Sequence, residues 1–308
     1  MIALADIGVF VPPARLDNVR EGMRFEAEES FVRDKIGFTT TSRKEPGQGA
    51  SDLCVGAWEN LRAKRPDMPA PEVLMVCTQN PDRRIPHTAS LVHHKLDLPE
   101  SCACMDVSLG CSGYVTTLSL AVGYMRANNL RTGVVFTADP YSEVLDREDR
   151  NTWLLFGDGA TATLLCEDGD LELGPVDSVS VSAEHDALTC GHGELLRMDG
   201  RRIFNFAMRH VPRSIDACLA GHGLGREDVD LYVLHQATGY MVENLRRRLG
   251  VPPEKLPFLP GSAGNTVSST IPMLLEGRLA DSSLSRILMC GFGVGLSVAT
   301  ALLTRRSS

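Results

Sequence analysis

Short apolar runs alternate with amphipathic stretches along this chain. Residues 72–78 and 229–235 are continuous, partly β-branched apolar runs of the length expected for buried strands. Amphipathic helices are predicted after them, at 87–96 and 239–249. Because continuous apolar strands need cover on both faces, this alternation predicts parallel βαβ units and an α/β fold.

The same series of elements occurs twice, offset by about half of the 308 residues. Each half has a small-residue turn opening an apolar helix and then two strands; the segments are 108–125, 132–140 and 159–167, then 260–279, 285–293 and 296–304. Chance recurrence within an ordinary α/β protein is the alternative. The shared order favours a duplication, with halves at 1–165 and 166–308. Small-molecule sites tend to form at the seam between such units.

The composition excludes several classes of protein but does not indicate a function. The 31 Lys and Arg against 39 Asp and Glu give a net charge of −8, which argues against a nucleic-acid partner. No apolar run reaches the roughly 18 residues of a membrane span, and the first residues lack the basic region of a signal peptide. Nine cysteines with no Cys-x-x-Cys pair indicate a reduced, cytoplasmic chain.

One cysteine stands in a setting that suits a nucleophile. Cys111 is flanked by Gly110, Ser112 and Gly113, small residues that permit a sharp turn from a strand into a helix. A sulfur at a helix N-terminus meets free N–H groups and the positive end of the helix dipole, which would lower the pKa of the thiol. The other eight cysteines are interpreted as small buried hydrophobic residues.

His235 and Asn265 are candidates to join Cys111 at the seam. His235 follows a buried strand, and catalytic groups gather at the carboxyl ends of strands in open α/β sheets. Asn265 occupies the repeat position that matches Cys111, although an Asn among Gly and Ser is ordinarily a turn residue. The other seven histidines lie in polar loops or helix faces and are assigned no role.

Two glycine-rich motifs need interpretation. The segment 291–295 half resembles a dinucleotide-binding loop, but a strand pattern follows it where a helix is needed. Bare backbone beside the cysteine, supplying N–H groups to an oxyanion, is the better interpretation. The segment 156–159 has the Asp-Gly pattern of a hairpin turn and needs no other role on its own.

These motifs, in this order, resemble those of β-ketoacyl-acyl carrier protein synthase III. The resemblance rests on the residues around Cys111, on 156–159, on His235-Gln236-Ala237, on Gly264-Asn265-Thr266 and on 291–293, and covers almost the whole chain. It implies the thiolase-like five-layered αβαβα fold with two duplicated halves, and a homodimer. It also implies a decarboxylating Claisen condensation of an acyl thioester with malonyl-acyl carrier protein.

The resemblance assigns roles to the matching positions. Cys111 would take the acyl group, while His235 and Asn265 would hold the thioester carbonyl of the malonyl extender during decarboxylation. The backbone N–H groups of Cys111 and Val294 would form the oxyanion hole, and Phe292 would pack beside the cysteine. Acyl-coenzyme A (acyl-CoA) and malonyl-carrier protein are the implied substrates, and no metal or other cofactor is implied.

The chain departs from the family at the donor site. Phe31, Lys35 and Ile36 stand where housekeeping members place a Trp and an Arg-Thr pair that hold the coenzyme A nucleotide, whereas Arg150 matches the family's second arginine there. An aromatic residue that shapes the acyl pocket becomes Ile85. Arg83 and Arg84 precede it and either face an anionic group or belong to a solvated loop.

A run of three arginines is the candidate docking surface for the carrier protein. Arg246, Arg247 and Arg248 lie on the predicted helix after His235, where the family offers a basic patch. Arg247 and Arg248 match that patch, and Tyr240 replaces its leading arginine. Three arginines on an exposed helix also serve solubility alone.

Other functions remain open from the sequence. Within the family, the altered pocket allows a condensing enzyme or acyltransferase of a specialised metabolite pathway. Outside it, Cys, His and Asn occur in the chain order of papain-like hydrolases, which differ in their paired cysteines and in the place of the nucleophile. A non-catalytic partner subunit is a third class, against which the complete triad argues.

Overall fold

The computed structural model describes residues 1–261 and 263–306, and nine of its strands form one long sheet in two groups. The sheet order is β11-β12-β13-β8-β1-β7-β6-β4-β5. The two groups join where β1 (Ala3–Phe10) meets β8 (Leu171–Ser180) through the single antiparallel pair Leu4–Leu171. The α/β fold expected from the pattern is therefore present, with an antiparallel join between the groups that the pattern did not reveal.

The first group holds three parallel strands, then one strand that runs antiparallel to them, then a last strand that is antiparallel to its neighbour. The parallel strands are β5 (Ala103–Val107), β4 (Val73–Cys77) and β6 (Thr132–Ala138), and β7 (Ala160–Cys166) and β1 complete the group. β4 and β6 are buried along their whole length, which is why they are apolar without alternation.

The second group has the same design with one strand fewer among the described residues. β11 (Leu231–Leu234) runs parallel to β12 (Arg286–Gly293), and β13 (Ser297–Arg305) and β8 follow antiparallel. No strand equivalent to β5 is assigned there; instead an irregular segment lies beside β11, with Tyr232 N–H donating to the Lys255 carbonyl at 2.7 Å.

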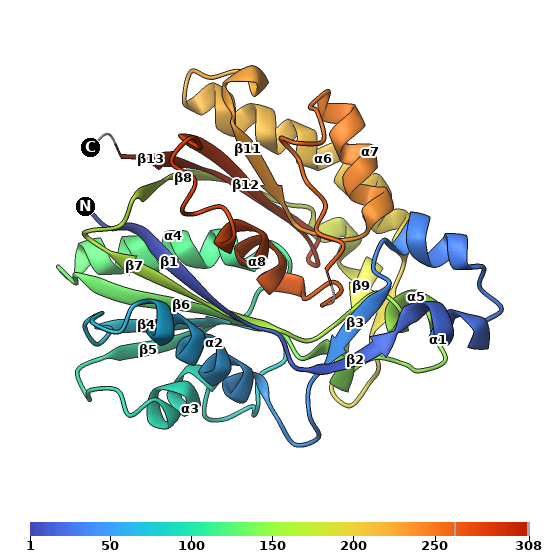
Figure 1. Ribbon diagram of the computed structural model, residues 1–308, viewed down its shortest axis with the longest axis horizontal. Helices are drawn as coiled ribbons and strands as arrows, with labels where there is room; N and C mark the ends of the chain where they lie inside the picture. Colours follow the sequence, from blue (N-terminus) through green and yellow to red (C-terminus); the bar gives the residue numbers. More distant parts are fainter. Residues whose placement is uncertain (262, 307–308) are drawn as a thin grey trace.

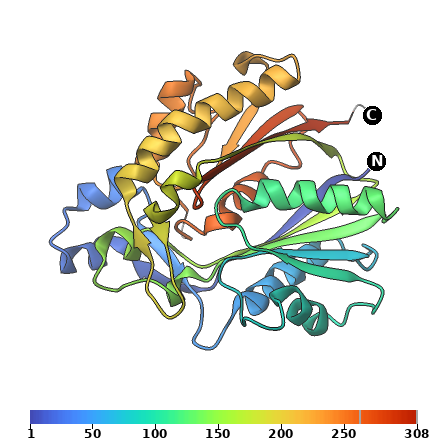
Figure 2. The same cartoon turned by 180° about the vertical axis from the view of Figure 1, so that it is seen from behind.

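Helices cover both groups and also separate them (Figure 1). α2 (Ala50–Lys64) and α3 (Thr88–Lys95) pack outside the first group, and α6 (Gly200–Gly221) and α7 (Gly239–Leu249) lie outside the second. α4 (Gly113–Ala127) and α8 (Thr270–Glu276) contact strands of both groups. Figure 2 shows α4 and α6 from the opposite side. The layers thus run α, β, α, β, α, as the resemblance implies.

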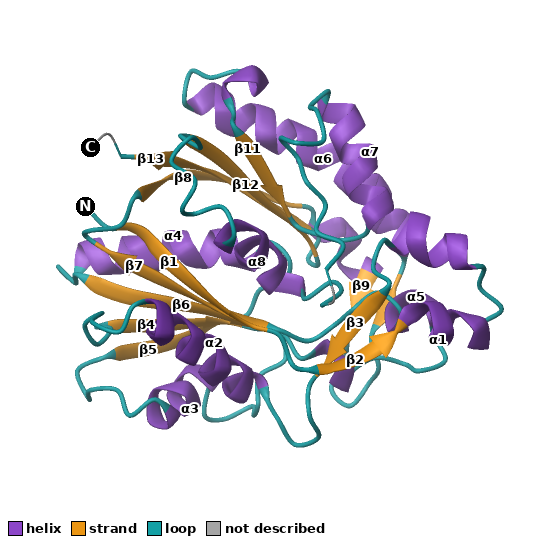
Figure 3. Cartoon of the chain, in the orientation of Figure 1, coloured by secondary structure: helices purple, strands orange, loops and turns teal. Residues whose placement is uncertain are grey.

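Short elements gather at one end of the sheets (Figure 3). They are the hairpin of β2 (Ala14–Asp17) and β3 (Thr40–Arg43), the pair β9 (Leu188–Thr189) and β10 (Arg197–Met198), the helices α1 (Asn18–Arg24) and α5 (Arg150–Trp153), the π-helix η1 (Phe31–Ile36) and the 3₁₀ turns η2 (Tyr141–Glu143), η3 (Ser182–Ala187) and η5 (Val267–Ser269). Several of them carry residues that line the cavity described below. The 3₁₀ turn η4 (Arg226–Asp228) instead precedes the start of β11.

The elements predicted from the pattern are found within a few residues. The strands expected at 72–78, 132–140 and 159–167 are β4, β6 and β7, and those at 229–235, 285–293 and 296–304 are β11, β12 and β13. The helices expected at 87–96 and 239–249 are α3 and α7. The segment 108–125 contains α4, and 260–279 contains α8, with Ser262 outside the described residues. No helix within the described ranges is long and apolar enough to cross a membrane.

Candidate active site

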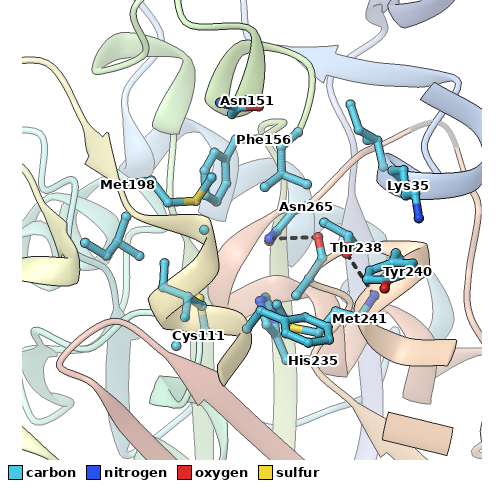
Figure 4. A pocket seen from close by; sticks show the side chains of 18 of the residues that line it. Lys35, Cys111, Asn151, Phe156, Met198, His235, Thr238, Tyr240, Met241 and Asn265 are labelled. Carbon is cyan, nitrogen blue, oxygen red and sulfur yellow. Dashed lines mark hydrogen bonds between the residues drawn. The ribbon is translucent and has the colours of Figure 1, made fainter. Parts of the chain in front are cut away.

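A cavity of about 450 Å³ brings Cys111, His235 and Asn265 together (Figure 4). Cys111 comes from the turn before α4, His235 from the end of β11, and Asn265 from the loop before η5. Phe292 and Gly293 of β12 line the same cavity. Residues far apart in the sequence thus bring the thiol, the imidazole and the amide to the lining of one cavity.

Bare backbone surrounds the Cys111 side chain. A Cβ at Gly293 would lie 2.8 Å from Cys111 Sγ, and one at Gly291 would lie 2.5 Å from the Cys111 carbonyl oxygen. On the other side, a Cβ at Gly113 would meet Cys77 Sγ at 2.3 Å. Glycine at these three positions is therefore a consequence of close approach, since any side chain would displace the turn that carries the sulfur.

The expected low pKa of the Cys111 thiol is wrong for this structure. Burial, and secondly the charge of Asp139, raise the pKa of Cys111 to about 12. The backbone N–H groups of Val294 and Cys111 act in the opposite direction but do not outweigh desolvation. The position at a helix start predicted a lowered pKa from the helix dipole alone and left out the cost of burying a charged thiolate.

The segment 291–295 is the end of β12 and the turn into β13. β12 ends at Gly293 and β13 begins at Ser297, so no helix follows the glycines. A dinucleotide loop is thereby excluded for this segment. Instead, the Val294 N–H faces the Cys111 sulfur together with the N–H of Cys111, and this pair of donors is what an oxyanion needs.

His235 is buried and held by its neighbours on both sides of the ring. Its Nδ1 lies 2.7 Å from the Thr270 hydroxyl at the start of α8, and the Phe292 ring meets it edge-on at 5.5 Å. Burial lowers the pKa of His235 to about 3, although the Val267 backbone carbonyl favours the protonated ring. The imidazole is therefore neutral at physiological pH and carries one N–H proton.

The Asn265 side chain is oriented by one backbone donor. Val267 N–H donates to Asn265 Oδ1 at 2.9 Å, so the amide nitrogen is the end left to face the cavity. Its Nδ2 makes only a long contact, 3.4 Å, with the Ala237 carbonyl. Val267 achieves this with φ of +55°, an unusual conformation for a β-branched residue.

The motif at 156–159 braces the Asn265 loop and is not a hairpin turn. Gly157 N–H donates to the Asn265 carbonyl at 3.0 Å, and a Cβ at Gly157 would lie 1.8 Å from the Ala263 carbonyl oxygen. The buried Asp158 carboxylate accepts from the N–H groups of Lys44 and Ser142. Contacts with residues distant in sequence therefore explain both Gly157 and Asp158, and a sequence pattern cannot show such contacts.

Asp139 is a buried carboxylate near the cysteine that sequence reasoning missed. It follows β6 and accepts from Gln79 N–H at 2.8 Å and from the Ser268 hydroxyl at 2.5 Å. Burial raises the pKa of Asp139 to about 6. Its place at the carboxyl end of a buried strand was the available signal, the same one that singled out His235.

Phe31, Lys35 and Ile36 line the mouth of the cavity, as do Arg201 and Phe204, which the sequence did not single out. Tyr240 is held between Phe204, stacked at 5.6 Å, and the Lys35 ammonium, 4.0 Å above the ring. Arg150 is not among the lining residues but packs its guanidinium 4.6 Å over the Phe31 ring. The positions expected to contact the donor therefore form one aromatic and cationic rim.

Ile85 does not line the cavity of its own chain. It is 83% exposed, and Arg83 and Arg84 beside it are also exposed, away from the mouth. Ile85 therefore takes no part in the cavity of a single chain, and its role in shaping an acyl pocket stays a prediction.

The three arginines of α7 are not equally free. Arg246 and Arg247 both pair with Glu243, at 2.7 Å and 2.6 Å, while Arg248 is exposed. The nearby α6 carries Arg201, Arg209 and Arg213 on its exposed face, and no ion pair among the described residues engages them. The arginines of α7 are consecutive and were therefore noticed in the sequence. Those of α6 are farther apart in the sequence and were missed.

The remaining cysteines are free, and most are buried. Cys190 is exposed and is the clearest exception to the expectation of buried hydrophobic residues, and Cys104 and Cys166 are half-buried. Across 1–261 and 263–306, no three His, Cys, Asp or Glu side chains cluster as metal ligands would.

Comparison with known proteins agrees with this geometry. A family model of 3-oxoacyl-[acyl-carrier-protein (ACP)] synthase III matches residues 105–182, and the model of its C-terminal part matches 219–305. The beta-ketoacyl-[acyl-carrier-protein] synthase III of Alkalilimnicola ehrlichii is 30% identical, over 96% of this chain and 97% of that one. A crystal structure of a 3-oxoacyl-(acyl-carrier-protein) synthase III matches with a TM-score of 0.92 at 33% identity, covering 98% of this chain and 99% of the other. A 3-oxoacyl-(acyl-carrier protein) synthase from Burkholderia xenovorans LB400 gives 0.91 at 31% identity, covering 99% and 94%.

Proposed function

The chain belongs to the 3-oxoacyl-[acyl-carrier-protein] synthase III family and is an acyl-transferring condensing enzyme of fatty acid biosynthesis, and we propose that Cys111, His235 and Asn265 carry its chemistry. The observation that supports these roles most strongly is their convergence on one cavity from both halves of the chain. A nucleophile alone would suit acyl transfer, whereas two further hydrogen-bond donors suit a reaction that builds negative charge on a second carbonyl.

In the first half-reaction, Cys111 Sγ attacks the carbonyl carbon of an acyl thioester. The negative charge that develops on the carbonyl oxygen is stabilised by the N–H groups of Cys111 and Val294. The carbon–sulfur bond of the donor then breaks, and the proton of the Cys111 thiol leaves with the departing thiol. Because the pKa of Cys111 is about 12, this proton is lost during the attack and not beforehand.

In the second half-reaction, His235 and Asn265 hold the thioester carbonyl of the malonyl extender. Loss of carbon dioxide leaves an enolate whose charge lies on that oxygen, facing the imidazole N–H and the Asn265 amide. The enolate carbon attacks the acyl-cysteine, and the Cys111–acyl bond breaks to leave the Cys111 thiolate. The thiolate takes a proton from solvent to restore the thiol, and the 3-oxoacyl product departs on its carrier. Removing either donor is expected to cost roughly 10²–10³ in rate.

Mass spectrometry of the intact protein separates these two steps. Incubation with acyl-CoA is expected to add one acyl group, which Cys111→Ala abolishes. Asn265→Ala is expected to acylate normally and to fail in malonyl decarboxylation. Roles for these residues are refuted if Cys111→Ala still condenses, or if Asn265→Ala loses acylation and decarboxylation equally.

We propose coenzyme A as the carrier of the first acyl group. Support comes from the rim: Phe31 and Arg150 offer a ring and a guanidinium for a base to stack on, and Lys35 and Arg201 offer charge for phosphates. The stack of Arg150 on Phe31 must open to admit a base, so carrier-bound donors remain the competing class for this chain.

We propose that the acyl carrier protein docks over α6 and α7 beside the mouth. Arg201, Arg209 and Arg213 on α6 add to Arg247 and Arg248 on α7, a basic surface on a chain of net charge −8. After burial, the charges of Arg209 and Arg213 are the next causes that lower the pKa of His210, which reflects the positive potential there. An acidic carrier matches this surface by charge.

We propose a homodimer that forms along β5. This strand ends the sheet order, so its outer edge has no neighbouring strand among the described residues, and Ile85 stands exposed beside it. Open edges are sites of strand pairing between chains. Sedimentation is expected to give twice the chain mass, and Met105→Pro in β5 is expected to give a monomer. A monomeric parent chain would contradict this assembly.

We also propose a cellular location and an internal organisation for the chain. Nine free cysteines suit the reducing cytoplasm, where we place the protein. The halves 1–165 and 166–308 are proposed as copies of one unit, and no metal or resident cofactor is proposed. The altered rim, with Phe31, Lys35 and Tyr240, keeps a specialised pathway as the alternative to housekeeping initiation.

A further inference from the structure

The Thr270 hydroxyl contacts three groups around the proposed active site. Its oxygen lies 2.7 Å from His235 Nδ1, accepts from Gln236 N–H at 3.3 Å, and lies 3.1 Å from the Val267 carbonyl oxygen. Thr270 is buried at the start of α8, the helix between the two groups of strands. It does not line the cavity with His235, so it can act on a substrate only through another residue.

A neutral imidazole has one N–H, and its position decides what His235 can do. A donor to the extender carbonyl requires the proton on Nε2, which leaves Nδ1 as an acceptor. The Thr270 hydroxyl also has one proton, with two acceptors in reach. If it donates to Nδ1, Nε2 keeps its N–H; if it donates to the Val267 carbonyl, Nδ1 must carry the imidazole proton and Nε2 becomes an acceptor.

We propose that Thr270 is a positioning residue that donates to Nδ1 of His235 and thereby holds the Nε2–H tautomer required for decarboxylation. The shorter of its two acceptor distances is the one to Nδ1, and the Gln236 N–H fills a lone pair of the same oxygen, which fixes the hydroxyl. The inference rests on the proposed role of His235 as a donor to the extender.

Val267 ties this arrangement to Asn265. With φ of +55°, its N–H reaches Asn265 Oδ1 at 2.9 Å, while its carbonyl faces both the Thr270 hydroxyl and the His235 imidazole. The backbone of Val267 therefore orients the Asn265 amide directly. It also contacts the Thr270 hydroxyl, which determines the position of the His235 N–H. The two donors proposed for the extender carbonyl are positioned by adjacent parts of a single loop.

The test compares Thr270→Val, which removes the hydroxyl, with Thr270→Ser, which keeps it. Malonyl decarboxylation is expected to fall by about 10²-fold in Thr270→Val and to recover to within a few-fold in Thr270→Ser. Acylation of Cys111, followed by mass, is expected to stay within a few-fold in both. Thr117→Val is the matched control, because it removes another buried threonine hydroxyl, on α4, that takes no part in the hydrogen bonds around His235.

Nitrogen-15 spectra of the unchanged protein give a second readout that does not depend on a variant folding. With His235 assigned by its loss in His235→Gln, the spectrum is expected to show a protonated Nε2 and an unprotonated Nδ1. A protonated Nδ1, a Thr270→Val enzyme that decarboxylates like Thr117→Val, or a Thr270→Ser enzyme as slow as Thr270→Val would overturn the inference. An unchanged protein that never decarboxylates malonyl-carrier would instead contradict the proposed function.

Discussion

Gly293 passes so close to Cys111 that a Cβ there would lie 2.8 Å from Sγ and 2.9 Å from the cysteine Cβ. The end of β12 therefore approaches the sulfur as bare backbone, and the Val294 N–H follows directly after it. This contact joins the two halves at the sulfur that we propose as the nucleophile, and it makes the geometry around Cys111 sensitive to one methyl group.

We expect Gly293→Ala to lower the acylation rate of Cys111 by at least about 10²-fold, because the sulfur or the Val294 N–H must move. The adduct formed with acyl-CoA over time, followed by mass, measures this rate. Gly123→Ala is the control: nothing lies within 4 Å of its Cβ on the exposed face of α4, so activity is expected to stay and stability to rise by about 0.5–1 kcal/mol. Equal acylation by the two variants would contradict the expected crowding.

We expect alkylation of Cys111 by iodoacetamide to rise about tenfold per pH unit between pH 6 and 10 without a plateau. The reason is that burial raises the pKa of this thiol to about 12, so the thiolate fraction keeps growing across the range. Peptide mass spectrometry locates the label, with the exposed Cys190 as internal reference. A plateau near neutral pH would show that the helix N-terminus lowers the pKa of Cys111 by more than burial raises it.

We expect the stability difference between the unchanged protein and Asp139→Asn to depend on pH. The pKa of Asp139 is raised from 3.8 to about 6, so the folded state binds more protons than the unfolded state between these values. Lowering the pH from 7.5 to 5 therefore stabilises the unchanged protein relative to the variant, by about 1 kcal/mol. Urea unfolding at the two pH values measures the change, and a difference of opposite sign would contradict the burial of an ionised Asp139.

We expect charge reversal on α6 to weaken use of the carrier substrate selectively. The triple variant Arg201→Glu, Arg209→Glu and Arg213→Glu is expected to raise KM for malonyl-carrier protein roughly tenfold at low salt, with less effect at high salt. KM for malonyl-pantetheine is expected to change less. Arg131→Glu is the control, because this exposed arginine precedes β6 and the proposed active site lies at the other end of that strand. Unchanged KM for the carrier would remove α6 from the docking surface.

We expect Phe31→Ala to raise KM for acyl-CoA several-fold and to leave acyl-pantetheine unaffected, because only the nucleotide would reach the stack of Arg150 on Phe31. The ratio of the two KM values is the measurement. If the ratio of KM for acyl-CoA to KM for acyl-pantetheine is the same in Phe31→Ala and in the unchanged protein, a donor that lacks the nucleotide is favoured.

Local pattern was enough to predict the strands and helices that carry the site. β4, β6, β11 and β12 are buried throughout or nearly so, and such strands appear in a sequence as apolar runs. The half-buried β5 and β8 gave no comparable signal, and the single pair that joins β1 to β8 is a long-range contact. The positions of Cys111, His235 and Asn265 followed from the repeat and from strand ends.

What could not be predicted depends on burial and on contacts distant in sequence. The pKa of Cys111 is set by desolvation and by Asp139, neither of which is visible in the residues beside it. Thr270 stands in a run of small hydroxyl residues, with no pattern to mark it before α8 places it against His235. Arg246 and Arg247 form ion pairs with Glu243, one turn earlier on the same helix. The direction of the Glu243 side chain is known only from the structure.

The central claim is a condensation through an acyl group held on Cys111, and following one acylated protein sample through both steps tests it most directly. Intact-protein mass spectrometry against a panel of acyl-CoA donors is expected to show one added acyl group, located at Cys111 by peptide mapping. Addition of malonyl-carrier protein is expected to remove it while a 3-oxoacyl-carrier of matching chain length appears. An adduct at another residue, no adduct with any donor, or loss of the acyl group without formation of the new carbon–carbon bond would contradict the account.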